Sequence, residues 1–487
     1  MFKRLLTDSV VYGVAKYLGV FASIFLMPIY TRLLTKADYG IMEIVNSWNA
    51  LVVILLPLGL SSSILRFQKD FEDDENEKKR YLGTILLTLS ALCLAYGIFM
   101  LFSKPLLIKV LGAYPGIDEI YLHGIAIATL SVLLGHFLTL LQAQLKKFRY
   151  LTVSLVNLCI LVTLGFTFVY HYRMGILGFF RASSIALTAS VMTGIIFTRD
   201  ELTLCFSRST LRTLLKYSIH ILSVNLLFSA INLLDRYILV TYAGLPEVGV
   251  YSIGVRISGI MGLAVSSFAL AWFPLAMRIK DNPDSKEVYK QVHNLYCLIA
   301  LTLYIGIIIG RKELIEVFAP GYEGVYGVIA YLSAHLLLNG SIYFYSLGLH
   351  IKNTTKYFTY TALVSTALNV ALSIALVDSM GVDGVALGTL AGCIAWVVIL
   401  FHFSQRIYPI DFDLKRVTLT IALGASALII SPHLNHILSL PLAIRVPIKL
   451  ALLALIGTAL AGLFFGRSGL KRVLQLLRER KRADSSN

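Results

Sequence analysis

The sequence has few charged residues. Asp, Glu, Lys and Arg make up 14% of its 487 residues, whereas hydrophobic residues make up 57%. A water-soluble domain typically has about 25% charged residues. The composition therefore excludes a water-soluble globular enzyme and a disordered protein, and it indicates a chain that lies mostly in lipid.

Motifs of metal, disulfide and nucleotide chemistry are missing as well. The five cysteines form no CxxC pair, and neither a GxxxxGK[ST] loop nor an HExxH motif occurs. We interpret the cysteines as small buried hydrophobic residues rather than as disulfide partners or zinc ligands. We therefore expect a protein that is not an enzyme and that uses no cofactor or metal.

Long apolar stretches predict about fourteen transmembrane helices, because a helix needs about 20 mainly apolar residues to cross a bilayer. Lys3 and Arg4 precede the first stretch, but no convincing small-residue cleavage site follows it. We interpret this stretch as a spanning helix rather than a signal peptide. The stretches begin near Ser9, Tyr39, Tyr81, Glu119, Leu151, Ile176, Leu214, Val248, Val292, Val325, Phe358, Val385, Leu419 and Val446.

The net charge of +16 is distributed unevenly along the chain. Lys and Arg gather in alternate loops, and a minority, including Arg311, Arg445 and Lys449, falls on the opposite side. Cytoplasmic loops of membrane proteins are enriched in Lys and Arg. The pattern predicts a multi-pass protein of the cell (inner or plasma) membrane with both termini in the cytoplasm, and it does not favour nucleic acid as a partner.

The sequence also contains an internal repeat. The segment ADYGIMEI at 37–44 resembles PEVGVYSI at 246–253, and MGILG at 174–178 resembles MGVDG at 380–384, with offsets of 209 and 206 residues. Six spans per half place both halves in the same orientation. We therefore predict an all-α polytopic membrane fold with two parallel six-helix bundles at 1–205 and 206–410, two extra transmembrane helices at 411–466, and a basic amphipathic cytoplasmic tail at 467–487.

Ionisable and amide side chains recur within several predicted spans. Such residues are costly in a membrane and typically line a cavity or pair with one another. Under the 209-residue offset, Lys16 matches Asn225 and Glu43 matches Ser252, so both halves would line one polar cleft. Cations outnumber anions along this cleft, which suits an anionic substrate because guanidinium groups bind phosphate oxygens.

Each of these charges also has a purely structural interpretation. Asp235 and Arg236 are adjacent in the sequence and could form a local ion pair. Arg181 could extend toward the membrane surface or hold a neighbouring carbonyl group. The residues alone leave both interpretations open.

A resemblance to polysaccharide repeat-unit (Wzx-type) flippases is carried by two segments. These are MPIYTRLLTKADYGIMEIVNSW at 27–48 and NLLDRYILVTYAGLPEVGVYSIGVRISGIMGLAVSSFALAWFPLAMR at 232–278. Such flippases belong to the multidrug/oligosaccharidyl-lipid/polysaccharide exporter (MOP) superfamily. The resemblance covers most of the chain and implies a V-shaped, MATE-like fold in which helices one, two, seven and eight line a central cavity.

The resemblance implies a flippase that moves a polyprenyl-diphosphate-linked oligosaccharide from the cytoplasmic to the outer leaflet, by alternating access, for cell-surface polysaccharide synthesis. Expected partners are this substrate and anionic lipid at the C-terminal tail; polysaccharide polymerase and chain-length machinery are further candidates. The candidate residues are Arg256, Lys16 and Arg236 for the diphosphate, Asn46, Asn49, Asn225 and Asn232 for sugars, Glu43 and Asp235 for ion coupling or a structural pair, and Arg181 as a further intramembrane charge.

Three alternatives stay open at this point. A lipid II flippase of peptidoglycan synthesis comes first, although the first two spans hold fewer arginines than those proteins tend to carry. A drug/cation antiporter follows, although it usually has twelve helices and an acidic cavity. A membrane-embedded sugar transferase or polymerase comes last, because the predicted outer loops are too short for a catalytic domain.

Overall fold

The computed structural model describes residues 19, 23–67, 74–111, 114–201, 203–352, 354, 356–437 and 440–485. Within these ranges, the side chains of residues 62, 75, 106–111, 220, 221, 223–232, 356, 359, 414, 432–437 and 465–485 are not described. The described secondary structure is helical throughout, without a strand, as the sequence predicts. Ten of the described helices are long and apolar enough to cross a membrane.

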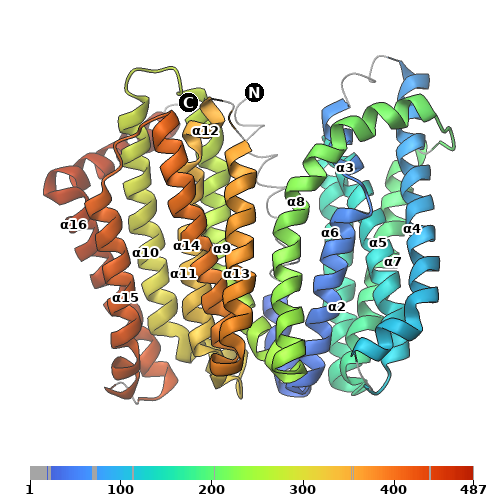
Figure 1. Ribbon diagram of the computed structural model, residues 1–487, viewed down its shortest axis with the longest axis horizontal. Helices are drawn as coiled ribbons and strands as arrows, with labels where there is room; N and C mark the ends of the chain where they lie inside the picture. Colours follow the sequence, from blue (N-terminus) through green and yellow to red (C-terminus); the bar gives the residue numbers. More distant parts are fainter. Residues whose placement is uncertain are drawn as a thin grey trace. The chain divides into compact units, whose positions relative to one another are not determined.

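The chain forms two compact units, Met1–Gly249 and Val250–Asn487. Residues 23–33 of the N-terminal unit are helical. Its further helices, blue to green in Figure 1, are α2 (Lys36–Leu55), α3 (Leu60–Phe67), α4 (Glu75–Leu111), α5 (Ile117–Ala143), α6 (Lys147–Phe166), the π-helical turn η1 (Thr167–His171), α7 (Gly175–Thr198), the 3-10 turn η2 (Arg199–Glu201) and α8 (Arg208–Tyr242). Within this unit α2 packs on α5 and α8, and α7 packs on α5 and α6.

The helix α9 (Leu245–Arg278) begins in the N-terminal unit and continues into the C-terminal unit. The C-terminal unit also contains α10 (Ser285–Phe318), the 3-10 turn η3 (Glu323–Val325), α11 (Tyr326–Tyr345), α12 (Leu347–Ile351), α13 (Lys356–Met380), α14 (Val382–Ile407), α15 (Leu414–Ile437) and α16 (Leu442–Ser485) (Figure 1). The helix α14 packs on α11 and α13, and α10 contacts α11, α15 and α16.

The predicted helix positions agree with these bounds. Each predicted start from Tyr39 onward lies within a helix, and the one near Ser9 lies outside the described residues. The helix α16 continues through the predicted tail to Ser485, but the side chains after Phe464 are not described, so the amphipathic character of the tail stays a prediction.

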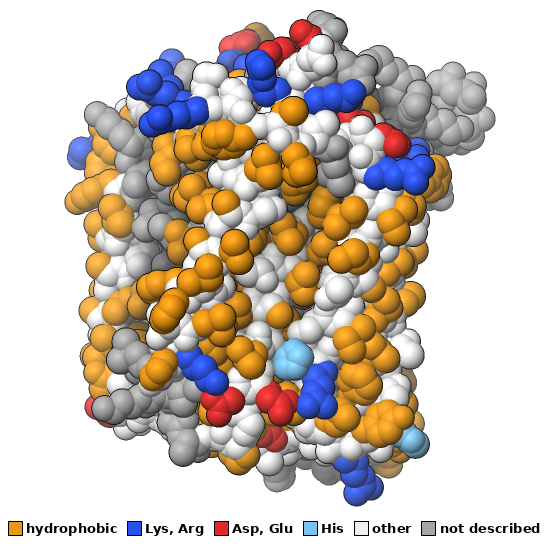
Figure 2. Space-filling model, turned by 90° about the vertical axis from the view of Figure 1, so that its right-hand side faces the viewer, with side chains coloured by type: hydrophobic (Ala, Val, Ile, Leu, Met, Phe, Trp, Pro, Cys, Tyr) orange, Lys and Arg blue, Asp and Glu red, His pale blue; other side chains and the backbone are white. Residues whose placement is uncertain are grey.

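The surface of the protein matches a lipid environment. On the face shown in Figure 2, hydrophobic side chains cover the middle, Lys and Arg gather at one end, and a smaller group of charges lies at the other. Large apolar side chains such as Phe102, Ile196 and Leu455 are more than half exposed. Exposed apolar surface of this extent is stable only against lipid or another protein, so the protein is a multi-pass membrane protein.

Two glycines that the predicted repeat aligns have the same unusual backbone angle. Gly175 and Gly381, which the repeat aligns, have φ angles of 58° and 56°. Gly175 is the first residue of α7, which packs on α6. Gly381 directly precedes α14, which packs on α13. Glycine adopts positive φ at little cost, so both MG motifs place a glycine where the backbone has a positive φ before or at the start of a helix.

Candidate functional site

The helix α2 carries three of the predicted site residues, Glu43, Asn46 and Asn49. A capping box fixes its start: the Asp38 backbone N–H donates to Thr35 Oγ1 at 3.1 Å, and the Thr35 N–H donates to Asp38 Oδ2 at 2.8 Å. Such boxes satisfy backbone donors at a helix start. Further along the helix, Glu43 and Asn49 are each only 6% exposed, and Asn46 is half-buried.

The start of α2 crosses the first turn of α9 at two glycines. A Cβ atom on Gly40 would overlap the Leu245 carbonyl oxygen, and a Cβ on Gly249 would overlap the Lys36 carbonyl oxygen. The two contacts are reciprocal, and both pairs of counterparts are related by the 209-residue offset of the repeat. Only glycine lets the two backbones approach this closely.

The helix α8 contributes two buried charges to the N-terminal unit. Asp235 is 3% exposed and Arg236 is 5% exposed, and α8 packs directly on α2. Three of the predicted charged residues, Glu43, Asp235 and Arg236, are therefore buried on two adjacent helices. A buried charge is destabilising unless it is paired or hydrogen-bonded, so replacing any of these three side chains is expected to disturb the charge balance between α2 and α8.

The remaining predicted site residues have different surroundings. Arg256 is half-buried on α9 in the C-terminal unit. Lys16 lies outside the described residues, and so do the side chains of Asn225 and Asn232 on α8. The roles of these residues therefore stay predictions.

Arg181 forms an ion pair with Glu119. Its guanidinium lies 2.8 Å from the Glu119 carboxylate, and the two side chains are 38% and 54% exposed. The pair joins α7 to α5, beside a hydrogen bond of 2.9 Å between His123 Nδ1 and Ser184 Oγ. Arg181 thus has a carboxylate partner rather than the carbonyl partner considered above.

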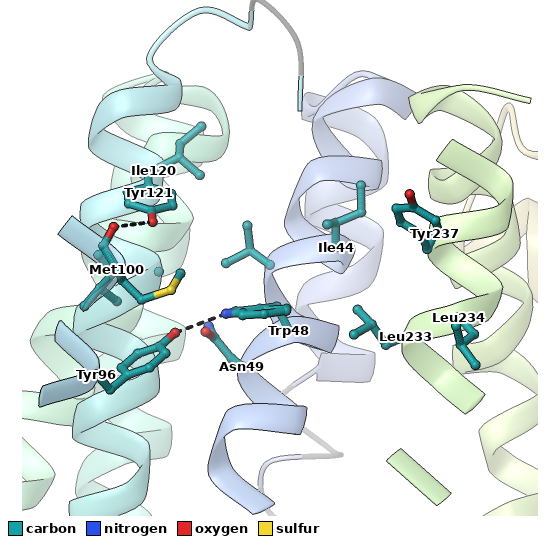
Figure 3. A pocket seen from close by; sticks show the side chains of 13 residues that line it. Ile44, Trp48, Asn49, Tyr96, Met100, Ile120, Tyr121, Leu233, Leu234 and Tyr237 are labelled. Carbon is teal, nitrogen blue, oxygen red and sulfur yellow. Dashed lines mark hydrogen bonds between the residues drawn. The ribbon is translucent and has the colours of Figure 1, made fainter. Parts of the chain in front are cut away.

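A cavity of about 290 Å³ lies among α2, α4, α5 and α8 of the N-terminal unit, and we call it the α2–α8 pocket (Figure 3). Trp48 Nε1 donates to Tyr96 Oη at 3.1 Å, and Tyr121 Oη donates to the Met100 carbonyl at 2.7 Å. The buried amide of Asn49 has no hydrogen-bond partner among the described residues. The full lining comprises Ile44, Val45, Trp48, Asn49, Tyr96, Met100, Ile120, Tyr121, Gly124, Ile125, Leu233, Leu234 and Tyr237.

The sequence predicts Asn49 as a site residue, but it does not predict the aromatic side chains that line this pocket. Trp48 lies between Asn46 and Asn49 on α2, and this position beside two predicted site residues is the local signal that points to it. Tyr96, Tyr121 and Tyr237 come from three other helices. Their position around one pocket depends on helix packing, which local sequence patterns do not report.

The C-terminal unit contains a buried ion cluster between α10 and α16. Glu313 accepts from Lys449 Nζ at 2.8 Å through both carboxylate oxygens and lies 2.6 Å from Arg445 Nε. Lys449 also donates to the Ile309 carbonyl at 2.8 Å, and Arg445 also pairs with Glu316. These contacts link the two helices α10 and α16.

Three cations that the sequence places on the side opposite the basic loops are buried within the C-terminal unit. Arg311, Arg445 and Lys449 are within helices and are 8%, 4% and 5% exposed. Arg311 donates to Ser431 Oγ on α15 at 3.0 Å and to the Tyr326 carbonyl at 3.2 Å. Their contacts hold the last two helices, α15 and α16, on α10.

The C-terminal unit also has an apolar cavity of about 420 Å³ among α10, α11, α14 and α15. Ile394, Val398 and Ile421 line it and are 46%, 58% and 57% exposed. Tyr345 and Phe401 lie deeper, with their ring centroids 5.0 Å apart. The cavity is therefore an apolar groove, and we call it the α14–α15 groove.

The chain matches one protein-family model in sequence. A family model described as "Polysaccharide biosynthesis protein" matches residues 5–280, which is more than half of the chain. No curated protein matches the chain.

Two solved structures share the fold. A lipid II flippase, MurJ, in an inward closed conformation has 17% sequence identity and a TM-score of 0.72, covering 94% of this chain and 99% of its own. An inward-facing multidrug resistance MATE family transporter of the MOP superfamily has 16% identity and a TM-score of 0.65, covering 85% and 96%. The predicted MATE-like fold is thereby confirmed.

Proposed function

Because the chain belongs to the polysaccharide biosynthesis protein family, we propose that it is a flippase for a polyprenyl-diphosphate-linked oligosaccharide. The substrate moves from the cytoplasmic to the outer leaflet by alternating access, and the protein catalyses no covalent step. The observation that carries this proposal is the family match over residues 5–280 on a chain with the fold of the MOP superfamily. Both termini lie in the cytoplasm, as the distribution of Lys and Arg favours.

The charged residues support an anionic headgroup. Arg256 and Arg236, together with Lys16, bind the diphosphate, because guanidinium groups form paired hydrogen bonds with phosphate oxygens. Asn46 and Asn49, with Asn225 and Asn232, contact sugar hydroxyls. Glu43 and Asp235, buried on the adjacent helices α2 and α8, carry the coupling ion or neutralise the arginines.

The α14–α15 groove suits the lipid end of the same substrate. Its lining is apolar, and three of its side chains are half-exposed, so a hydrocarbon chain can bind there without burying polar groups. The polyprenyl chain thus stays in contact with apolar surface while the headgroup crosses. Anionic lipid at the basic tail and a polysaccharide polymerase remain the further partners that the proposal includes.

The test is mass spectrometry of polyprenyl-linked lipids from cells depleted of the protein. We expect a diphosphate-linked oligosaccharide to accumulate and to disappear when the wild-type chain is restored. Arg256→Ala should fail to clear it at equal protein level, while Arg181→Ala, which removes an exposed arginine paired with Glu119, should clear it. Accumulation of lipid II would instead assign the protein to peptidoglycan synthesis, and the absence of any intermediate would favour drug or cation antiport.

A further inference from the structure

We infer that the segment joining the two halves of the repeat is a fixed strap, which stays bound to the N-terminal unit throughout the transport cycle. The predicted boundary between the halves lies between residues 205 and 206, inside the extended segment 203–207, and we call this segment the strap. The strap leads into α8, whose first turns are held by the same unit. The chain therefore passes from one moving body to the other only after Ser218.

Hydrogen bonds hold the strap along the first turns of α4. Thr203 Oγ1 donates to the Lys79 carbonyl at 2.6 Å, and the Ser207 N–H donates to Thr84 Oγ1 at 3.0 Å. Gly83 lies between these contacts on the helix, and a Cβ atom there would overlap the Thr203 carbonyl oxygen. Only glycine lets the backbones of the strap and of α4 approach this closely.

The Glu201 carboxylate holds the chain just before the strap. It lies 2.9 Å from Lys78 Nζ and 3.7 Å from Lys146 Nζ, and the Glu201 side chain is 19% exposed. Lys78 lies near the start of α4, and Lys146 directly precedes α6. The two ion pairs therefore link this part of the chain to two different helices of the N-terminal unit.

The first turns of α8 belong to the hydrophobic core of the N-terminal unit. Leu214 is fully buried in one cluster with Tyr81 and Ile85 of α4. Leu211 and Leu215, on the same part of α8, pack against this cluster. Burial of apolar side chains stabilises a contact in proportion to the area removed from water, so the start of α8 is held by packing as well as by the strap.

Contacts with α3 and with the residues before it extend this anchor to Ser218. Ser218 is fully buried, and a Cβ atom on Gly59 would overlap the Ser218 carbonyl oxygen. Tyr217 packs edge-to-face on Phe67 of α3, with the ring centroids 5.5 Å apart. The anchored part of α8 therefore runs from its first residue, Arg208, to Ser218.

These contacts disfavour a hinge at the strap. Hinges are loop or helix-end residues that absorb large changes in φ and ψ, and flexible linkers are rich in glycine and serine. Residues 199–218 contain no glycine. A rotation at the strap would break its hydrogen bonds and the ion pairs of Glu201, and would separate Leu214 from its core.

The first test measures detachment of the strap by limited trypsin digestion of the purified full-length protein in detergent. Cleavage after Arg208, timed by mass spectrometry, requires the strap and the start of α8 to open. Gly83→Ala, whose methyl group overlaps the strap, should speed this cleavage at least about tenfold. Thr203→Val, which removes one hydrogen bond, should speed it about threefold.

Gly97→Ala is the matched control for Gly83→Ala. Both glycines lie on α4, but a Cβ atom on Gly97 meets only the Ile125 side chain, at 4.0 Å. This variant should be cleaved after Arg208 at the wild-type rate. Cleavage of the wild type as fast as that of Gly83→Ala would overturn the fixed strap.

The second test asks whether the anchor must open during transport, and it rests on the proposed function. Phe67→Cys and Tyr217→Cys are joined by a reducible bis-methanethiosulfonate reagent, in a background where the exposed Cys159 and Cys205 are replaced by serine. We expect the cross-linked protein to flip the diphosphate-linked oligosaccharide in proteoliposomes within about threefold of its rate after reduction, because the steps that limit transport leave this contact closed. Each single-cysteine variant, treated in the same way, is a control.

The two tests separate failure of the strap from failure of the flippase function. A larger loss of flipping on cross-linking, restored by reduction, would show that the anchor opens and would overturn the inference. If no variant flips the substrate in either the cross-linked or the reduced form, the flippase proposal fails, and the digestion still decides whether the strap is fixed.

Discussion

Removal of the Glu313 carboxylate is expected to destabilise the C-terminal unit severely. Glu313 is 7% exposed and is the shared partner of two buried cations, Lys449 at 2.8 Å and Arg445 at 2.6 Å. The substitution Glu313→Leu leaves both cations without this partner in an apolar interface. Breaking a buried pair in this way costs about 3–5 kcal/mol, because an uncompensated charge remains.

The physical cause can be separated from a general packing defect. A triple variant with Glu313→Leu, Arg445→Met and Lys449→Met removes the cations as well, and should recover most of the lost stability, because apolar replacement of a whole buried ion group is often neutral. Glu316 provides the matched control. Its side chain is 50% exposed, so Glu316→Gln should cost less than about 1 kcal/mol.

The assay is equilibrium unfolding in mixed micelles of dodecyl maltoside and SDS, followed by the reactivity of Cys297 with a thiol-specific dye. Cys297 lies on α10 and is 5% exposed, so it reports when this helix loses its neighbours. The reasoning would be refuted if Glu313→Leu and Glu316→Gln cost the same, or if the triple variant were as unstable as the single one.

Three further predictions concern the N-terminal unit. Gly40→Ala or Gly249→Ala should lower the free energy of unfolding by at least about 2 kcal/mol in the same micelle titration, because the added methyl overlaps a backbone carbonyl; an unchanged midpoint would contradict the close crossing. Arg181→Ala, which breaks the exposed pair with Glu119, should cost less than about 1 kcal/mol and should leave transport intact in a complementation assay. Asn49→Leu should raise the melting temperature of the protein, since a buried unpaired amide costs about 1–3 kcal/mol.

Most of the helices could be predicted from the sequence because they are long and apolar enough to cross a membrane. Apolar runs of this length have few alternative structures, so the predicted starts at Tyr39, Tyr81 and later positions all lie in helices. The repeat could be found because each half has a glycine at a close backbone crossing and another where the backbone has a positive φ. Gly40 and Gly249 form the close crossing, and Gly175 and Gly381 have the positive φ.

The buried polar contacts could not be predicted in the same way. Arg445 and Lys449 lie near the end of an apolar run, where a charge in a loop and a charge buried against Glu313 give the same local pattern. Trp48 and Tyr96 are hydrogen-bonded across a separation of 48 residues. Such pairs are decided by which helices pack together, and hydropathy carries no information about that choice.

The most direct test of the proposed function is a flipping measurement in proteoliposomes. The substrate is the diphosphate-linked oligosaccharide isolated from depleted cells, and its exposure at the outer leaflet is followed by oxidation with periodate, which does not cross the membrane. We predict that the wild-type protein moves substrate between leaflets, that Arg181→Ala does so at a similar rate, and that Arg256→Ala is at least tenfold slower. Exposure no faster than in protein-free vesicles, under both a proton and a sodium gradient, would contradict the flippase function.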